Sequence, residues 1–269
     1  MIRELASKKK VLIVSFLLIV LMIYYLGTYY SDGLYHNNLN CGAYIFYTLN
    51  SFLPFYLLLA FLSNNLVTSN FYQNKYSKFQ NMIIPRTGFR KRMLYEIKTV
   101  LFSSIIVRLM IHIFTLIVIH FFFSEIHFQG LESSAFVALN TNSTISLLLY
   151  IVYSTVGFAI FSLFLYSLIY FIKNKYIYNV SGIIILVVLA VSLALIGNAL
   201  YANQLNVKLF NPLLEAINTL SLILPGLETS TVITSIRETN LYFGYTCIMF
   251  LIYSCVLCFI GCNLTRKKS

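Results

Sequence analysis

One stretch of the sequence places three polar side chains at the spacing of a single helix face. Ser104, Arg108 and His112 follow one another at intervals of four residues inside a long apolar run, and residues four apart lie one above the other on an α-helix. Arg108 lies ten residues past Lys98, which is about 15 Å along a helix. In a membrane, an arginine at this depth faces the protein interior or a wet cavity.

None of the apolar runs contains an acidic residue. The guanidinium of Arg108 must therefore meet tyrosine, serine or asparagine side chains, backbone carbonyls, water or an anionic ligand. Two interpretations follow. Arg108 is either a structural anchor that hydrogen-bonds to a neighbouring helix, or a residue of a substrate pathway that would also include Ser104 and His112.

Histidine and cysteine are the other side chains with chemistry of their own. His112 and His120 are eight residues apart and lack a nearby carboxylate, so we interpret both as interior histidines bonded to hydroxyl groups. Tetrahedral metal sites draw ligands from converging segments, whereas four cysteines of the last apolar run share roughly one helix face. We interpret these as packing residues and expect no metal site: Cys247, Cys255, Cys258 and Cys262.

Motifs of hydrolases and nucleotide-binding proteins are absent from the sequence. There is no G-x-S-x-G, no H-E-x-x-H and no G-x-x-x-x-G-K-[ST] phosphate-binding loop. The chain is therefore not expected to be an enzyme or to bind a cofactor. If transport by this chain uses ATP, a partner protein must bind and hydrolyse it.

The elements that position these residues are membrane-spanning helices. Of the 269 residues, 59% are hydrophobic and 10% are charged, where a soluble domain has about 25% charged residues. At about 20 apolar residues per span, we predict one all-helical integral membrane domain, residues 1–269, in which the first span is retained and not cleaved. The six predicted spans are residues 11–30, 44–66, 98–123, 143–172, 178–200 and 241–264.

Basic residues predict the orientation of these spans. With both chain ends in the cytoplasm, all but three of the 19 basic residues lie on the cytoplasmic side; the exceptions are Lys208, Arg237 and the intramembrane Arg108. This is the positive-inside pattern, so the net charge of +11 requires no nucleic acid. The abundance of Ile, Asn and Lys indicates AT-rich coding, and we expect the plasma membrane of a bacterium.

A long basic segment, residues 67–97, joins the second and third spans, and we call it the elbow. Pro85 ends its first helix, a Thr-Gly turn follows, and a second helix is predicted to begin at Phe89 and to continue without a break into the third span. The elbow can dock into another protein, or it can lie on anionic lipid. Its first helix is predicted to be amphipathic from the spacing of Tyr72, Tyr76, Phe79 and Ile83.

A second unusual segment, residues 201–240, lies on the outer side. Asn211 and Pro212 form a typical helix start, and Pro225-Gly226 ends the apolar stripe that follows. A helix of this length reaches about 20 Å, which is too short to cross. We expect short re-entrant or interfacial helices before the last span, with a second one over residues 231–236.

This layout resembles a bacterial ABC-2-type transporter permease, the membrane half of an ATP-driven exporter whose ATPase is a separate chain. The similarity covers the six spans, the elbow and the short outer helices. At residue level it lies mainly in residues 84–98, where an Arg-turn-aromatic-basic run leads to Lys98 at the mouth of the third span. The resemblance implies that the ATPase contacts Arg86, Thr87, Gly88, Phe89, Arg90, Lys91 and Arg92.

The resemblance also implies the partners. Two permease copies or homologues would pair around a central path, the partner subunit would bind ATP and magnesium, and the cargo would be a peptide, lipid-like or drug-like molecule. A membrane immunity or sensor protein that binds a peptide without transporting it is the alternative from a different class. A self-sufficient secondary transporter should place acids or broken helices at mid-membrane, and the apolar runs contain no such acids.

Overall fold

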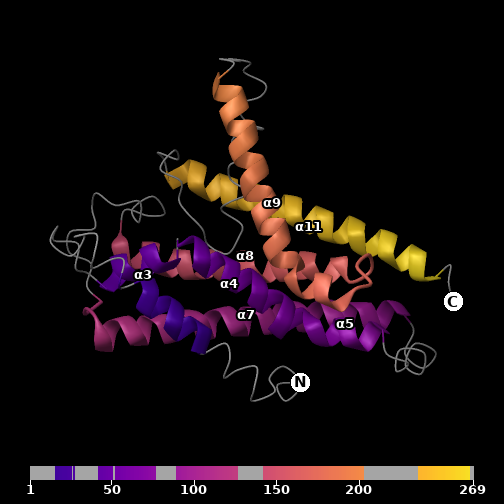
Figure 1. The fold of residues 1–269 in the computed structure, drawn as a ribbon, viewed down its shortest axis with the longest axis horizontal. Coiled ribbons are helices and arrows are strands. Elements are labelled where there is room, and N and C mark those ends of the chain that lie inside the picture. The colour runs from indigo at the N-terminus through magenta and orange to yellow at the C-terminus, as the bar shows by residue number, and fades with distance from the viewer. Residues whose placement is uncertain are drawn as a thin grey trace.

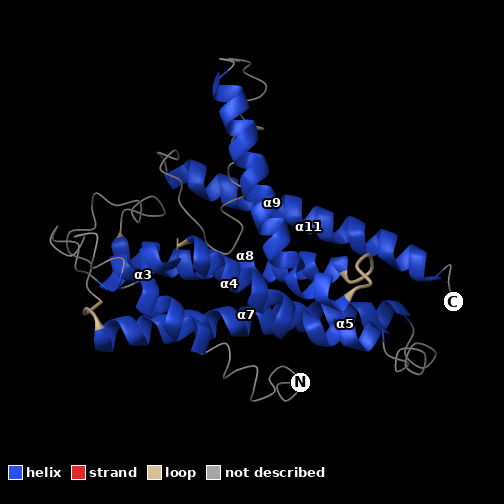
Figure 2. Cartoon of the chain, viewed as in Figure 1, coloured by secondary structure: helices blue, strands red, loops and turns tan. Residues whose placement is uncertain are grey.

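The computed structural model of the chain describes residues 16–25, 27, 42–50, 52–76, 89–126, 142–202 and 236–266. Every regular element in these residues is a helix (Figure 2). The predicted outer helices around residues 211–236 lie almost wholly outside them. After a helix over residues 16–25 come α3 (Gly42–Asn50), α4 (Leu53–Leu62), the π-helical segment η2 (Ser63–Thr68), α5 (Ser69–Tyr76), α7 (Phe89–Phe122), α8 (Ser143–Leu168), α9 (Lys175–Ala202) and α11 (Ile236–Arg266).

Among the described residues, two helices are long and apolar enough to cross a membrane, Lys91–Phe122 within α7 and Thr144–Leu168 within α8. A third span results if the bent pair Gly42–Asn50 and Pro54–Tyr76 counts as one. Large apolar side chains cover the outward faces of these helices, which indicates a membrane location. The prediction of an all-helical membrane protein is thus confirmed at this level, while the described residues account for two or three of the six predicted spans. Examples of the exposed side chains are Phe102, Met110, Ile113, Phe121, Leu148 and Val152.

The helix α8 is the centre of the bundle. In its apolar window 61% of the residues are buried inside the protein, against 28% in that of α7. Its most extensive contacts are with α7 and α11, and Figure 1 shows α7 lying alongside α8 in the opposite direction. The core of the molecule therefore lies along α8, and α7 presents most of its surface outward.

Two asparagines define where helices begin. The side chain of Asn142 accepts hydrogen bonds from the backbone N–H groups of Thr144 and Ile145, at 3.0 and 3.3 Å. Asn174 caps α9 in the same way through the N–H of Tyr176, at 2.8 Å. These caps satisfy donors that have no partner within the first helical turn.

The second predicted span, residues 44–66, is a broken helix. α3 ends at Asn50, α4 begins at Leu53, and the two parts are bent by 67°. Pro54 in the first turn of α4 explains the break, because proline lacks the N–H that a continuous helix would need at this position. After Leu62 the helix widens into η2, whose polar residues turn towards α9.

The helix α9 crosses the bundle instead of following it. Asn64 of η2 donates from its side-chain amide to the carbonyl oxygen of Tyr178, at 2.6 Å, and to the hydroxyl of Ser181, at 3.0 Å. Gly182 then passes directly over Ala60 of α4. Beyond this crossing α9 extends away from the other helices (Figure 1), so the predicted span 178–200 is helical but does not lie beside the others.

The close crossing of α9 over α4 predicts that alanine substitutions at two glycines have different effects on stability. A Cβ atom at Gly182 would lie 2.9 Å from the carbonyl oxygen of Ala60, whereas a Cβ at Gly244 of α11 would have nothing within 4 Å. We expect Gly182→Ala to destabilise the protein by about 1–3 kcal/mol, as overpacking does. Gly244→Ala, the matched control, should be neutral or slightly stabilising. Thermal unfolding in detergent measures both, and equal midpoints would contradict the close crossing.

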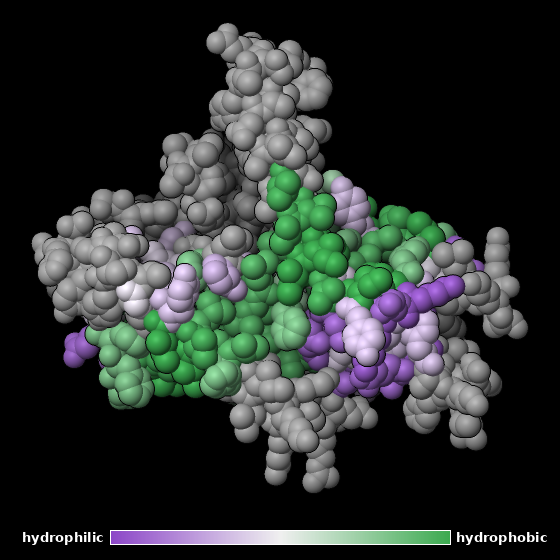
Figure 3. Space-filling model, viewed as in Figure 1, coloured by the Kyte–Doolittle hydropathy of each residue, from purple (hydrophilic) through white to green (hydrophobic). Residues whose placement is uncertain are grey.

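Hydrophilic side chains mark one end of the bundle. Hydrophobic side chains cover the middle of the face in Figure 3, and hydrophilic ones gather at the end where α5 lies. The end of α5 meets the end of α8 there, since Nζ of Lys75 donates to the carbonyl oxygen of Ile169 at 3.0 Å. At the other end the N–H of Gly42 donates to the carbonyl oxygen of Glu125 at 3.0 Å. Segments predicted to share a membrane side thus lie at the same end.

Candidate functional site

The helix that leaves the elbow is continuous with the third apolar run. α7 runs from Phe89 to Phe122 without a break, which confirms the predicted continuity of this helix with the third apolar run. Phe89 and Arg90 form its first turn, and Lys91 is exposed. Three of the predicted coupling residues, Arg86, Thr87 and Gly88, lie outside the described residues.

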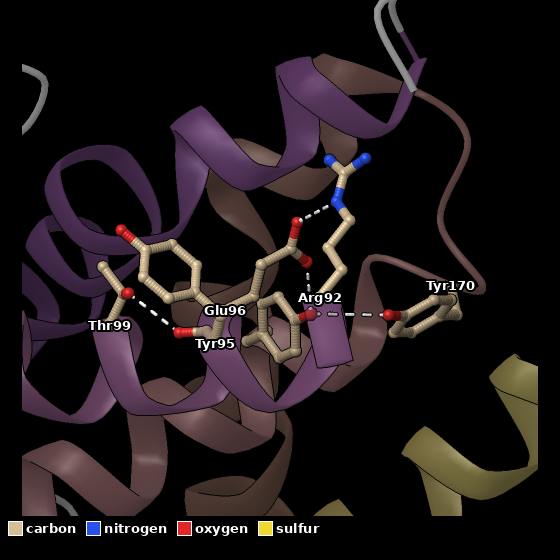
Figure 4. Close-up of polar contacts among 6 residues, drawn as sticks. Arg92, Tyr95, Glu96, Thr99 and Tyr170 are labelled. Atoms are coloured by element: carbon tan, nitrogen blue, oxygen red, sulfur yellow. Dashed lines mark hydrogen bonds and ion pairs between the residues drawn. The ribbon is translucent and has the colours of Figure 1, made fainter. Parts of the chain in front are cut away.

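Arg92 is linked to the rest of the bundle through the carboxylate of Glu96. Its Nε donates to Oε1 of Glu96 at 2.9 Å, and the hydroxyl of Tyr166 on α8 donates to Oε2 of Glu96 at 2.6 Å. The hydroxyls of Tyr166 and Tyr170 are 3.4 Å apart. Figure 4 shows Glu96 on α7 between Arg92 and these tyrosines. Arg92 therefore pairs with a carboxylate of its own helix, and that carboxylate, through Tyr166, makes the contact with α8.

The other arm of the elbow also contacts α8. Tyr76 donates from its hydroxyl to the carbonyl oxygen of Ile169 at 3.2 Å, and Lys75 lies over the ring of Tyr170, 4.0 Å from its centroid. Tyr72 donates to the carbonyl oxygen of Lys173. The last carbonyls of a helix favour such donors and positive charge. The predicted apolar face of the elbow is thus, at its start, packed on protein.

Arg108 lies near the middle of the Lys91–Phe122 span and is fully buried. Its Nη2 donates to Oδ1 of Asn50 on α3 at 3.0 Å. The guanidinium also lies 5.7 Å from the centroid of the Phe55 ring, within the range of a cation–π contact. Asn50 is held in turn, because its amide donates to the carbonyl oxygen of Phe46 at 2.7 Å. The geometry favours the anchor interpretation, in which Arg108 ties α7 to α3 and α4.

His112 is one turn further along the same face. Its Nε2 lies 2.6 Å from the hydroxyl oxygen of Ser154 on α8, so the prediction of an interior histidine bonded to a hydroxyl is confirmed here. Within the described residues, Nδ1 of His112 and the hydroxyl of the nearby Tyr150 are buried without a hydrogen-bond partner. A polar group entering the bundle at this level would meet these two atoms.

Ser104 is buried on the same face but is satisfied locally. Its hydroxyl donates to the carbonyl oxygen of Val100, one turn earlier on α7, at 2.6 Å. Ser103 and Thr115 donate to backbone carbonyls of α7 in the same way, the usual behaviour of hydroxyls within a helix. The predicted face is therefore present, while only Arg108 and His112 use it to reach other helices.

Two predicted interior side chains are exposed. His120 is eight residues past His112, and eight steps of about 100° leave it about 80° away from that face; its side chain points outward. The same rotation separates the exposed Cys255 from the buried Cys247, whereas Cys258 is buried. In the described ranges, no three His, Cys, Asp or Glu side chains come together as a metal-binding group.

Sequence reasoning missed the partners of the predicted residues. Asn50, Ser154 and Tyr166 were not singled out, although Asn50 was detectable as one of three asparagines in the predicted span 44–66. Comparison of the chain with known protein families, with curated proteins and with solved structures finds no match to any of them. The similarity to ABC-2 permeases therefore stays a prediction from layout and from residues 84–98.

Proposed function

We propose that the chain is the permease subunit of an ATP-driven exporter of the ABC-2 type in a bacterial plasma membrane. In this proposal it has six spans with both ends in the cytoplasm, pairs with a second copy or a homologue, and is powered by a separate ATPase chain that binds ATP and magnesium. The cargo class is a peptide, a lipid-like molecule or a drug-like molecule. The chain itself contributes the substrate path and the surface that contacts the ATPase.

The observation that carries this proposal is the unbroken helix α7. It leads from the basic first turns at Phe89 through Lys91 and Lys98 to the buried Arg108 and on to Phe122. A continuous helix transmits displacement along its axis, since its backbone hydrogen bonds resist bending except at prolines, π-bulges or similar interruptions. A protein docked at the elbow would thus move groups at mid-membrane.

Two further features support a separate motor. The sequence contains no phosphate-binding loop, so nucleotide energy must enter through another chain. The exposed side chain of Lys91 lies at the start of α7 and is available for contact with an ATPase.

The apolar side chains on the outward faces of α7, α8 and α11 suit contact with lipid or with a second permease copy.

The proposal predicts that a neighbouring reading frame encodes an ATPase with a phosphate-binding loop, and reconstitution with that ATPase tests it. The purified complex is placed in liposomes and supplied with a fluorescent amphipathic peptide, a labelled phospholipid or a hydrophobic dye. We expect the ATPase to co-purify and at least one probe to move only with ATP. A partner ATPase whose phosphate-binding lysine is replaced should be inactive.

Two results would overturn the proposal. One is movement of a probe by the chain alone, which would indicate a self-sufficient transporter. The other is tight binding of the peptide with no ATP-dependent movement and no ATPase association, the behaviour of an immunity or sensor protein.

A further inference from the structure

Glu96 joins two helices at the polar end of the bundle. One carboxylate oxygen accepts from Nε of Arg92, one turn earlier on α7, and the other accepts from the hydroxyl of Tyr166 on α8, at 2.9 and 2.6 Å. The side chains of Arg92 and Glu96 are only 12% and 13% exposed, and Tyr166 is 1% exposed. We call Arg92, Glu96 and Tyr166 the Glu96 joint.

The ion pair with Arg92 does not by itself explain how Glu96 links α7 to α8. The ion pair between Arg92 and Glu96 lies within α7, four residues apart, and so links nothing beyond this helix. The hydroxyl of Tyr166 is what connects α7 to α8. Hydrogen bonds to a charged acceptor are shorter and stronger than neutral ones, so this contact holds α8 at a defined position along α7.

The entering arm of the elbow contacts the same part of α8. Phe71 packs edge-on against the ring of Tyr166, with centroids 5.8 Å apart. Lys75 and Tyr76 both donate to the carbonyl oxygen of Ile169. Both arms, α5 before the elbow tip and α7 after it, are therefore fastened to residues 166–172.

The turn that directly follows α8 contacts the last helix. A Cβ atom at Gly261 of α11 would lie 2.5 Å from Cβ and Cγ of Tyr170, so α11 passes this tyrosine at the closest distance that a glycine allows. A shift of residues 166–172 towards α11 would therefore press Tyr170 against the backbone of α11. The end of α8 is thus packed between the elbow arms and α11.

We propose that residues 166–172 are the point where motion of the elbow enters the bundle, with Glu96 as the positioning residue that delivers the motion of α7 to α8. The inference rests on the proposed function, because it requires a motor that moves the elbow. Without the Tyr166 hydroxyl, α7 and α8 lose this hydrogen-bonded link, and movement of α7 is transmitted less directly to residues 166–172.

The test measures hydrogen exchange in the reconstituted complex with its ATPase, with and without a non-hydrolysable ATP analogue. In the wild-type chain the analogue should change exchange at the start of α7 and at residues 160–172. In Tyr166→Phe, which removes one hydroxyl and keeps the ring, the change at residues 160–172 should fall about fivefold or more, as expected for a lost hydrogen bond to a charged group, while the change at the start of α7 persists.

Two variants complete the design. Glu96→Gln offers one acceptor oxygen to two donors and should behave as Tyr166→Phe does. Tyr176→Phe removes the hydroxyl of a tyrosine that is 82% exposed, and it should behave as the wild type does. The nucleotide-dependent difference is the decisive quantity, since a merely structural contact would alter exchange equally with and without the analogue.

The outcomes separate the two proposals. If the analogue changes both regions in Tyr166→Phe and Glu96→Gln as it does in the wild type, the role of Glu96 is refuted and the permease proposal stands. If the wild-type chain shows no nucleotide effect at the start of α7, the permease proposal fails and this inference fails with it.

Discussion

Replacing Asn50 by leucine is expected to destabilise the protein by about 2 kcal/mol or more, because it leaves the buried guanidinium of Arg108 without its amide acceptor. Arg108 donates to Oδ1 of Asn50 at 3.0 Å in a fully buried setting. Removing one partner of a buried charged contact costs more than removing both. Adding Arg108→Leu to Asn50→Leu should therefore recover part of the lost stability.

A double-mutant cycle on thermal unfolding in detergent measures this coupling. Met110→Leu is the matched control on the same helix, since Met110 is 62% exposed, and it should leave the midpoint unchanged. The result also decides between the two roles of Arg108. If Arg108→Leu folds and assembles as the wild type does but abolishes export, Arg108 belongs to the substrate pathway and the anchor interpretation is wrong.

Charge reversal at the start of α7 is expected to abolish association with the ATPase. The variant Arg90→Glu/Lys91→Glu changes two positions of the first turns of α7 and leaves Arg92 in place, because Arg92 binds Glu96. If the elbow docks on the ATPase, reversed charges at the contact should reduce co-purification about tenfold or more, as like-charge juxtaposition costs several kcal/mol. Quantitative pull-down at two salt concentrations is the measurement.

Lys173→Glu is the control for this experiment. It makes a charge change of the same kind at an exposed residue at the same end of the molecule, outside the elbow. Adding Arg92→Glu to the double reversal should in addition lower the unfolding midpoint, because the carboxylate of Glu96 loses its cation. If the ATPase still co-purifies with the double variant and hydrolyses ATP at the normal rate, the basic residues at the start of α7 contact lipid and not the ATPase.

Much of the secondary structure could be predicted from the sequence. The helix from Phe89 into the third apolar run and the start of α8 at Ser143 lie where they were expected. Hydrophobic periodicity, proline and glycine positions act over short distances along the chain, so they are readable without a fold. The burial of Arg108 and His112 was predictable for the same reason, since a polar face in an apolar helix must point inward.

The partners of those residues were decided by the tertiary structure alone. Asn50 is 58 positions from Arg108, Ser154 is 42 from His112 and Tyr166 is 70 from Glu96. Which of several serines, tyrosines and asparagines reaches a given side chain depends on how helices are rotated and offset, and no local pattern encodes that.

The sequence by itself determined that this protein is helical, that it belongs in a membrane and which helix faces are polar, because transfer free energy and helix periodicity depend only on the order of residues. Tertiary packing decided the crossing of α9 over Ala60 and the partners that Arg108 and His112 reach on other helices. It also decided that both arms of the elbow contact the end of α8. These features depend on close contacts between distant segments, and such contacts form only when the helices pack together.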